Sequence, residues 1–398
     1  MTVAVPVRAE TSPATAPLNP AHFADAALRP LAEKLIAGRP LDIADGMALW
    51  NTRDIFSLGE LANFVRRRLH ADRTYYNINR HINYSNICAL SCKFCEFQRK
   101  RGEQGAYELS HEDIFATALK AVNGGATEVH IVGGLHPWLP FDWYLNMLRG
   151  LRTRFPQLHL KAFTAIEINH FTKIARLSTR EVLLALKEAG LGSLPGGGAE
   201  VFDDRVHDEV FKGKLRADGW IDVHRTAHQL GLRTNATILY GHVESREERI
   251  KHLLTLRQLQ SEAPATGGFQ TIIPLSFIPE GSELGHLPGN TGLEDLKMLA
   301  ISRLMLDNFD HVKAFWIMQS MKLSQVSLNW GVDDLDGTVV WYDITKREGG
   351  AGNRHQEQTV DSIRRLIVEA GFEPVERDTL YRRVIRDPNN WATGWRVE

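Results

Sequence analysis

Short apolar runs alternate with longer amphipathic stretches along most of this chain, and this alternation constrains the fold more than any other feature. Most of the runs are too short for helices, whereas the stretches between them space their apolar residues as one face of a helix does. Repeated strand–helix units predict a parallel sheet covered by helices. The expected strands span residues 82–88, 128–133, 159–164, 192–195, 234–240, 269–275, 314–318 and, least distinctly, 326–329.

Capping boxes mark where several of the intervening helices begin. In this pattern a hydroxyl accepts from one backbone N–H, and a carboxylate three residues later reaches back to another. Gly190 follows one of these helices as its expected C-cap. The matching pairs are Ser110 with Asp113, Ser178 with Glu181, Ser245 with Glu248, and Thr291 with Glu294.

This arrangement predicts an α/β fold, a (β/α) barrel of the TIM type that is complete or nearly complete. The alternative is an open doubly wound sheet, but no G-x-G-x-x-G motif follows the first strand. We expect a disordered arm at 1–21, a helical N-terminal segment at 22–72 and the barrel at 73–332. Residues 333–398 are expected to form a small C-terminal extension that packs on the barrel.

Composition argues against several classes of partner. The 398 residues carry a formal net charge of -1, so there is no electrostatic reason to expect nucleic acid or an anionic membrane as a partner. No apolar run approaches the roughly 18–20 residues that would span a bilayer. The N-terminal residues lack the apolar region of a signal peptide. We therefore expect a cytoplasmic protein.

The three cysteines of the chain, Cys88, Cys92 and Cys95, lie within eight residues in a C-x3-C-x2-C spacing. A cubane iron–sulfur cluster normally takes four thiolates, so three would leave one iron open to another ligand. The sequence therefore predicts a [4Fe–4S] cluster at the mouth of the barrel, just after the first strand. The alternatives are a structural zinc site completed by His81 or His130, an electron-transfer cluster, and three unliganded thiols.

With Phe94 before the last cysteine, this motif resembles the signature of the radical S-adenosylmethionine (SAM) superfamily. The resemblance implies that the open iron binds SAM. It also implies that an electron from the cluster releases a 5′-deoxyadenosyl radical, while the protein orients SAM and excludes water.

Longer stretches resemble one family of that superfamily, the aminofutalosine synthases of menaquinone biosynthesis. This resemblance implies that SAM is a consumed co-substrate, whose adenosyl radical adds to the vinyl ether of 3-[(1-carboxyvinyl)oxy]benzoate. Rearrangement and loss of carbon dioxide would then give 6-amino-6-deoxyfutalosine. The stretches are residues 86–95, 128–137, 161–168, 193–200, 235–244 and 314–318.

Two related families share several of these stretches, namely the cyclic dehypoxanthinylfutalosine synthases and the deazaflavin (FO) synthase subunits. Both tend to have Gln and Asn where this chain has Val132, before Gly-Gly, and His136, before Pro. These two positions favour the aminofutalosine synthases. In the other two families the radical would abstract hydrogen, and 5′-deoxyadenosine would be a product.

The resemblance also implies further site residues. Groups that bind the cofactor are expected from the ends of the strands, and the electron is expected from a donor such as flavodoxin or ferredoxin. In place of the Glu that often follows Gly-Gly in the superfamily, this chain has Leu135. The expected cofactor-binding residues are Phe94, Gly133, Gly134, Thr164, Glu167, Gly197 and Glu200.

The implied substrate carries two carboxylates, which require cations or strong hydrogen-bond donors. We expect His136, His242 and Arg303 to act in catalysis or to bind these carboxylates, with Arg225 as a further candidate. His136 could also transfer a proton, because histidine titrates near neutral pH.

Overall fold

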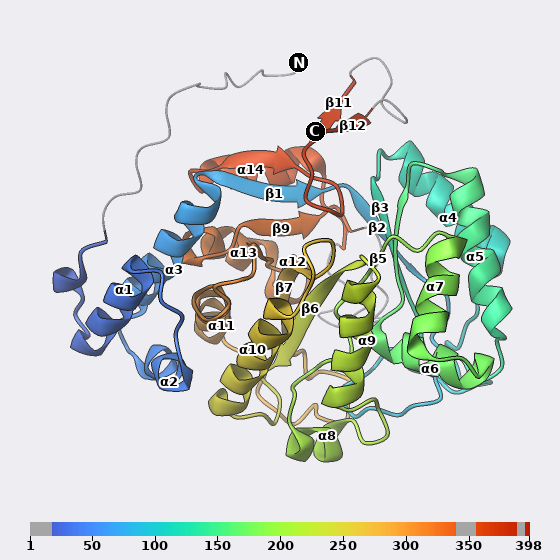
Figure 1. The fold of residues 1–398 in the computed structure, drawn as a ribbon, viewed down its shortest axis with the longest axis horizontal. Coiled ribbons are helices and arrows are strands. Elements are labelled where there is room, and N and C mark those ends of the chain that lie inside the picture. The colour runs from blue at the N-terminus through green and yellow to red at the C-terminus, as the bar shows by residue number, and fades with distance from the viewer. Residues whose placement is uncertain (1–17, 340–355, 388–394) are drawn as a thin grey trace.

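The computed structural model describes residues 18–339, 356–387 and 395–398. All but the last four residues of the expected disordered arm lie outside these ranges. The expected helical segment contains two short 3-10 helices, η1 (Pro20–His22) and η2 (Ala26–Leu28). They are followed by α1 (Arg29–Ile36), α2 (Ile43–Asn51) and α3 (Ile55–His70), at the left of Figure 1.

A seven-stranded parallel sheet forms the centre of the molecule (Figure 1), and its strands follow one another in chain order. The sheet curls into a partial (β/α) barrel, which confirms the predicted fold class. Its strands are β2 (Asn79–Asn83), β3 (Glu128–Val132), β4 (His159–Ala162), β5 (Ser193–Leu194), β6 (Arg233–Tyr240), β7 (Phe269–Ser276) and β8 (His311–Val312).

The helices between these strands begin largely where the capping patterns predict. The boxes at Ser110, Ser178 and Ser245 form both of their hydrogen bonds, and Gly190 ends its helix in the left-handed region. Thr291 accepts from Glu294 N without the reciprocal bond. The helices are α4 (His111–Asn123), α5 (Phe141–Arg154), α6 (Ala165–Ala175), α7 (Thr179–Ala189), α8 (Asp204–Val210), α9 (Ala217–Gln229), α10 (Arg246–Ser261) and α11 (Gly292–Met305).

Two of the predicted strands are wrong. Residues 314–318 lead into the short helix α12 (Trp316–Gln319), and residues 326–329 belong to α13 (Met321–Ser327) and the 3-10 helix η3 (Leu328–Trp330). A short run of apolar residues occurs both in buried helices and in buried strands, so the spacing of its apolar residues does not distinguish a helix from a strand.

A second sheet joins the strand that follows the N-terminal helices to two strands from the C-terminal part of the chain. Its central strand β1 (Arg73–Asn77) pairs in parallel with β9 (Asp334–Gly337) and with β10 (Glu373–Glu376). A bridge between Lys313 and Asp334 links β9 to the end of β8. The C-terminal part of the chain also contains α14 (Val360–Glu369) and the hairpin of β11 (Val384–Arg386) with β12 (Trp395–Val397).

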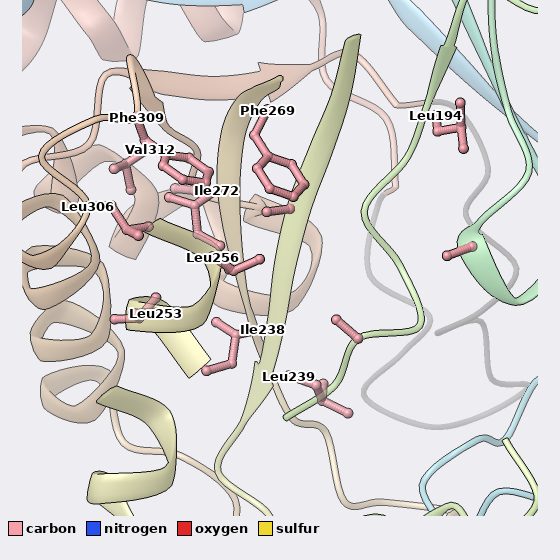
Figure 2. Packing of buried hydrophobic residues seen from close by; sticks show 14 of the residues in the cluster. Leu194, Ile238, Leu239, Leu253, Leu256, Phe269, Ile272, Leu306, Phe309 and Val312 are labelled. Carbon is pink, nitrogen blue, oxygen red and sulfur yellow. The ribbon is translucent and has the colours of Figure 1, made fainter. Parts of the chain in front are cut away.

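The barrel is held by side chains packed between its strands and the surrounding helices (Figure 2). Leu253 and Leu256 of α10 belong to the same cluster as Ile238 of β6 and Phe269 and Ile272 of β7, and all five are fully buried. Burying a side chain of this size contributes about 1.5–3 kcal/mol. The strand ends, and the loops that follow them, are therefore held on a rigid frame.

Candidate functional site

A cavity of about 840 Å³ opens at the carboxyl ends of the parallel strands. Its wall includes residues from the loops after β2, β3, β4 and β5, the ends of β6 and β7, the start of α11, and α12. In parallel barrels this end of the strands is where active sites are built. One end of the cavity is formed by the loop that carries Cys88, Cys92 and Cys95.

The cysteine loop is fixed by hydrogen bonds from both sides. The backbone N–H groups of Leu90 and Leu135 each donate to Cys88 Sγ at 3.4 Å. Lys100 Nζ donates to the carbonyls of Cys88 at 2.9 Å and Leu90 at 2.8 Å. Donors aimed at a sulfur stabilise a thiolate, and hydrogen bonds of this kind tune iron–sulfur clusters.

The donor set fits a [4Fe–4S] cluster that keeps one iron open, because three thiols on one loop line the same cavity. Burial raises the pKa of Cys92 to about 11 and also raises the pKa of Cys95. Binding iron would therefore release protons from these thiols. His81 and His130, the candidate fourth ligands of a zinc site, do not line this cavity, and their rings pack 4.3 Å apart on β2 and β3.

Glu167, in the first turn of α6, lies at the ends of three neighbouring strands. Its Oε2 accepts from Thr164 N at 2.7 Å and Thr164 Oγ1 at 2.9 Å, which forms the capping box of α6. Its Oε1 accepts from the Tyr84 hydroxyl at 2.8 Å and from Gly133 N at 3.2 Å. Burial raises the pKa of Glu167 to about 7, and these hydrogen bonds limit the rise.

Glu200 and Lys214 form a buried ion pair beside the cysteine loop. Lys214 Nζ also lies 5.1 Å from the centre of the Phe94 ring, and its charge interacts with Cys92 and Cys95. Among the lining residues that the structure describes, Lys214 is the only lysine, arginine or histidine. The cysteine end of the cavity is therefore polar and carries one paired cation.

The three expected glycines line the cavity, and two of them have no room for a side chain. A Cβ on Gly133 would lie 2.5 Å from the Tyr84 ring, and one on Gly134 would lie 2.4 Å from the carbonyl oxygen of Ile87. A Cβ on Gly197 would meet only Thr164, at 3.1 Å. The first two glycines are thus required by close packing, and the third leaves space for a ligand.

The expected catalytic residues are not among the residues that line this cavity. His136 Nε2 lies 2.7 Å from Glu108, and its Nδ1 accepts from the backbone of Trp138 and Leu139. The side chain of His242 is fully buried, with Nε2 3.1 Å from the Leu239 carbonyl oxygen. Each of these two rings therefore has partners within its own loop or close to it.

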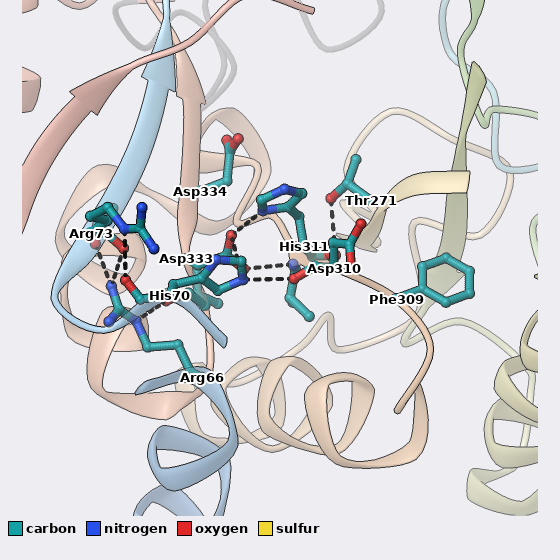
Figure 3. Close-up of polar contacts among 12 residues, drawn as sticks. Arg66, His70, Arg73, Thr271, Phe309, Asp310, His311, Asp333 and Asp334 are labelled. Carbon is teal, nitrogen blue, oxygen red and sulfur yellow. Dashed lines mark hydrogen bonds and ion pairs between the residues drawn. The ribbon is translucent and has the colours of Figure 1, made fainter. Parts of the chain in front are cut away.

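Arg303 lies near the other end of α11, about 12 Å along the helix from Asp295 of the cavity wall. It pairs with Asp333 and donates to the carbonyls of Gly331 and Asp310. Asp333 also lies between His70 and His311, as Figure 3 shows. The further candidate Arg225 is half-exposed and pairs with Glu262.

The buried His70–His311–Asp333 group has three potential ligand atoms within 4.8 Å of one another. The two rings stack with an interplanar angle of 20° and centroids 4.8 Å apart. A metal ion lies close to the plane of each ring that binds it, and two parallel, stacked planes share no such position. With Arg303 already paired to Asp333, the group is an ion-pair network.

Sequence reasoning missed Tyr84, Lys214 and the residues of the opposite wall of the cavity. Asp295 and Gln319 line that wall and meet at the Tyr240 hydroxyl, which is buried behind it: Tyr240 donates to Asp295 at 2.6 Å, and Gln319 Nε2 donates to Tyr240 Oη at 3.2 Å. Tyr84 lies within the predicted strand at 82–88 but directly follows the observed strand β2, so the shifted strand boundary hid its place at the strand end. Lys214 lies in a polar turn, and no local pattern distinguishes it from other surface lysines.

No helix within the described residues is long and apolar enough to cross a membrane.

Comparison with protein families gives two matches. The family model of the radical SAM superfamily matches residues 82–256, and that of the CofH/MqnC C-terminal region matches residues 266–389.

Three curated relatives are similar over most of the chain. An aminodeoxyfutalosine synthase of Thermus thermophilus is 47% identical, covering 90% of this chain and 96% of the relative. Another, of Streptomyces coelicolor, is 44% identical over 89% of this chain and 93% of the relative. A 5-amino-6-(D-ribitylamino)uracil–L-tyrosine 4-hydroxyphenyl transferase of Archaeoglobus fulgidus is 38% identical over 81% of this chain and 92% of the relative.

Two solved structures share the fold. Methylornithine synthase superposes with a TM-score of 0.68 at 22% identity, covering 86% of this chain and 97% of the other. A maturase of the [FeFe]-hydrogenase superposes with a TM-score of 0.70 at 15% identity, covering 94% and 79%.

Proposed function

Because the chain belongs to the radical SAM superfamily and, within it, to the aminodeoxyfutalosine synthases, we propose that it joins the 5′-deoxyadenosyl group of SAM to 3-[(1-carboxyvinyl)oxy]benzoate. The new bond links C5′ to the vinyl carbon, the aryl group migrates from the ether oxygen to carbon as the aryl C–O bond breaks, and methionine and carbon dioxide leave. One electron is taken up when SAM is cleaved and one is given back when the product forms, so the reaction is redox-neutral overall. The observation that carries this proposal is that the three cysteines share one cavity with a second, aromatic wall.

We propose that Cys88, Cys92 and Cys95 hold the cluster. When bound, the cluster supplies the electron that cleaves the C5′–S bond of SAM. The chain itself binds and orients SAM and the acceptor and excludes water, so no protein nucleophile is required. The groups that we propose to contact SAM are Phe94, the backbone of Gly133, Gly134 and Gly197, and Glu200 at the cysteine end of the cavity.

The opposite wall supports an aryl acceptor. It presents the apolar side chains of Phe277, Trp316 and Met318 and the polar groups of Ser276 and Gln319. Apolar walls with a few placed polar groups are typical of pockets that bind small organic ligands. Such pockets have volumes of about 300–1,000 Å³. The cavity is near the upper end of that range, which suits two small molecules side by side.

An anaerobic turnover with reconstituted protein, a reductant, SAM and 3-[(1-carboxyvinyl)oxy]benzoate tests the proposal. Mass spectrometry should find an adduct that retains the adenosyl group and has lost carbon dioxide. Cys88→Ala should form no adduct. If 5′-deoxyadenosine accumulates and no adduct forms, the substrate is wrong, and the relatives at 36–38% identity become the better guide to it.

We further propose that a small electron carrier such as flavodoxin or ferredoxin reduces the protein in the cytoplasm. The experiment is to replace the chemical reductant by each purified carrier with its reductase. Adduct formation with either carrier would support the proposal. If dithionite supports adduct formation and neither carrier does, the proposal is contradicted.

A further inference from the structure

We propose that Tyr84 and Glu167 are positioning residues, which together hold the backbone of Gly133, Gly134 and Leu135 in place for SAM and for the first cysteine. The inference rests on the proposed function in one respect, namely that SAM binds at the cysteine end of the cavity. It changes the role expected of Glu167 from a contact with the cofactor to a support for residues that make such contacts.

The hydrogen bonds of the Glu167 carboxylate are the first observation. An ionised carboxylate offers about four lone-pair sites, and here both oxygens accept two bonds each. Thr164 fills Oε2 through its N–H and its hydroxyl, at 2.7 and 2.9 Å. Tyr84 and Gly133 fill Oε1, at 2.8 and 3.2 Å. Because its acceptor sites are used within the protein, Glu167 has none left for a ligand.

These four bonds tie together the ends of three consecutive strands. Tyr84 directly follows β2, Gly133 directly follows β3, and Thr164 lies two residues after β4. Glu167 is 1% exposed and Tyr84 is fully buried, so water does not compete for the bonds. The four donors favour the ionised form of Glu167, whose pKa is about 7, and hydrogen bonds to a buried charge are among the stronger ones in proteins.

Packing reinforces the hydrogen bonds at Gly133. The Tyr84 ring lies so close that a Cβ on this glycine would be 2.5 Å from it. On its other sides the ring packs against Tyr144 at 5.6 Å and Phe163 at 6.4 Å between centroids. The ring therefore supports the glycine, while its hydroxyl fixes the carboxylate that bonds to the same residue.

The supported segment is in turn bonded to the cysteine loop. Gly134 N donates to the Ser85 carbonyl at 2.8 Å, and Ala89 N donates to the Leu135 carbonyl at 2.9 Å. Leu135 N donates to Cys88 Sγ at 3.4 Å. A continuous set of contacts thus runs from Glu167 through residues 133–135 to the sulfur of the first cysteine.

The test compares Tyr84→Phe with Tyr144→Phe. The first variant removes the hydroxyl that bonds to Glu167, and the second removes a neighbouring buried hydroxyl that does not. In reconstituted protein we expect Tyr84→Phe to bind SAM about tenfold more weakly by equilibrium dialysis and to hold less iron per chain. We expect Tyr144→Phe to match the unsubstituted protein in both. Neither measurement uses the aryl substrate, so a wrong substrate assignment would leave the result unaffected.

Glu167→Gln and the double variant complete the test. An amide keeps one acceptor oxygen but turns an NH₂ group toward one pair of donors, so we expect weaker SAM binding here too. If both residues act through one carboxylate, the double variant should lose less affinity than the product of the two single losses. Multiplicative losses would overturn the proposal, as would wild-type SAM binding by Tyr84→Phe.

Two further outcomes would also contradict the proposal. If Tyr144→Phe weakened SAM binding as much as Tyr84→Phe, the effect would be one of general packing. If Glu167→Gln abolished SAM binding while Tyr84→Phe had no effect, Glu167 would contact SAM directly. Should Tyr84→Phe fail to fold, the iron content of Glu167→Gln decides: a positioning residue predicts less iron per chain than in Tyr144→Phe, whereas a residue that only contacts SAM predicts equal iron in both.

Discussion

At the scale of single residues, Lys214 is the charge that bears most directly on the cysteine loop. It is buried beside Glu200, and its charge interacts with Cys92 and Cys95. A nearby cation favours the extra electron of a reduced cluster. We therefore expect Lys214→Met to lower the midpoint potential of the bound cluster by tens of millivolts, where 59 mV corresponds to a tenfold change for one electron.

Potentiometric titration followed by electron paramagnetic resonance would measure this shift. Lys212→Met is the matched control, because Lys212 lies in the same turn but is exposed. An unchanged potential in Lys214→Met, or an equal shift in both variants, would contradict the prediction.

Gly134 carries a second prediction at the residue scale. An alanine here would place its Cβ 2.4 Å from the Ile87 carbonyl oxygen and 3.0 Å from Cys88 Cβ. The cysteine loop would have to move, because the obstruction is backbone. We expect Gly134→Ala to hold less than half of the normal iron after reconstitution. In Gly124→Ala, where the nearest atom is 3.4 Å away, iron content should be normal.

At the scale of elements, α14 and β10 connect the C-terminal part of the chain to the rest of the fold. Ile367 of α14 is fully buried in the main hydrophobic cluster, whereas its neighbour Val368 is half-exposed. Phe372, which precedes β10, lies under the Arg66 guanidinium at 3.9 Å. The C-terminal segment therefore shares its core with the barrel.

We expect Ile367→Ala to lower the free energy of unfolding by about 2–5 kcal/mol, because it leaves a cavity in the core. Val368→Ala should change it by less than about 0.5 kcal/mol. Urea denaturation of both variants checks the pair. Equal, small changes would mean that α14 contributes little to the stability of the whole fold.

At the scale of the whole molecule, buried histidines should govern stability in acid. Burial lowers the pKa of His81, His159 and His228 to about 4 and that of His252 to about 3. These pKa values are below that of a histidine in the unfolded chain, about 6.5. At any pH between the folded and the unfolded value, the unfolded chain therefore binds more protons than the folded protein does. The stability that depends on these histidines being neutral is fully present above pH 6.5 and is lost as the pH falls toward 4.

Each such histidine costs the folded state about 3 kcal/mol by pH 4. The four together cost about 12 kcal/mol by pH 4, which is as large as the usual total stability of about 5–15 kcal/mol, so we expect the protein to unfold between pH 5 and pH 4. Denaturation series between pH 8 and 5 would give the proton uptake from the slope. His252→Gln should reduce that uptake by about one proton, whereas replacement of the exposed His22 should not. A stability that is flat across this range would contradict the prediction.

Local features of the fold were predictable because they depend on residues a few positions apart. The capping boxes at Ser178 and Ser245 close over three residues, and they form as expected. The expected strands at 314–318 and 326–329 were wrong, because a four- or five-residue apolar run does not determine its own conformation. The pairing of β1 with β10 joins residues about three hundred positions apart, and no local pattern marks it.

By itself, the sequence determined the alternation of strands and helices and the spacing of Cys88, Cys92 and Cys95. Both are short-range properties, set by side-chain periodicity and by the reach of one loop. Only the tertiary structure decided that Tyr84 meets Glu167, 83 residues away, and that Lys214 faces the cysteine loop. Such contacts depend on which strand ends lie side by side once the sheet has curled, and periodicity carries no information about that.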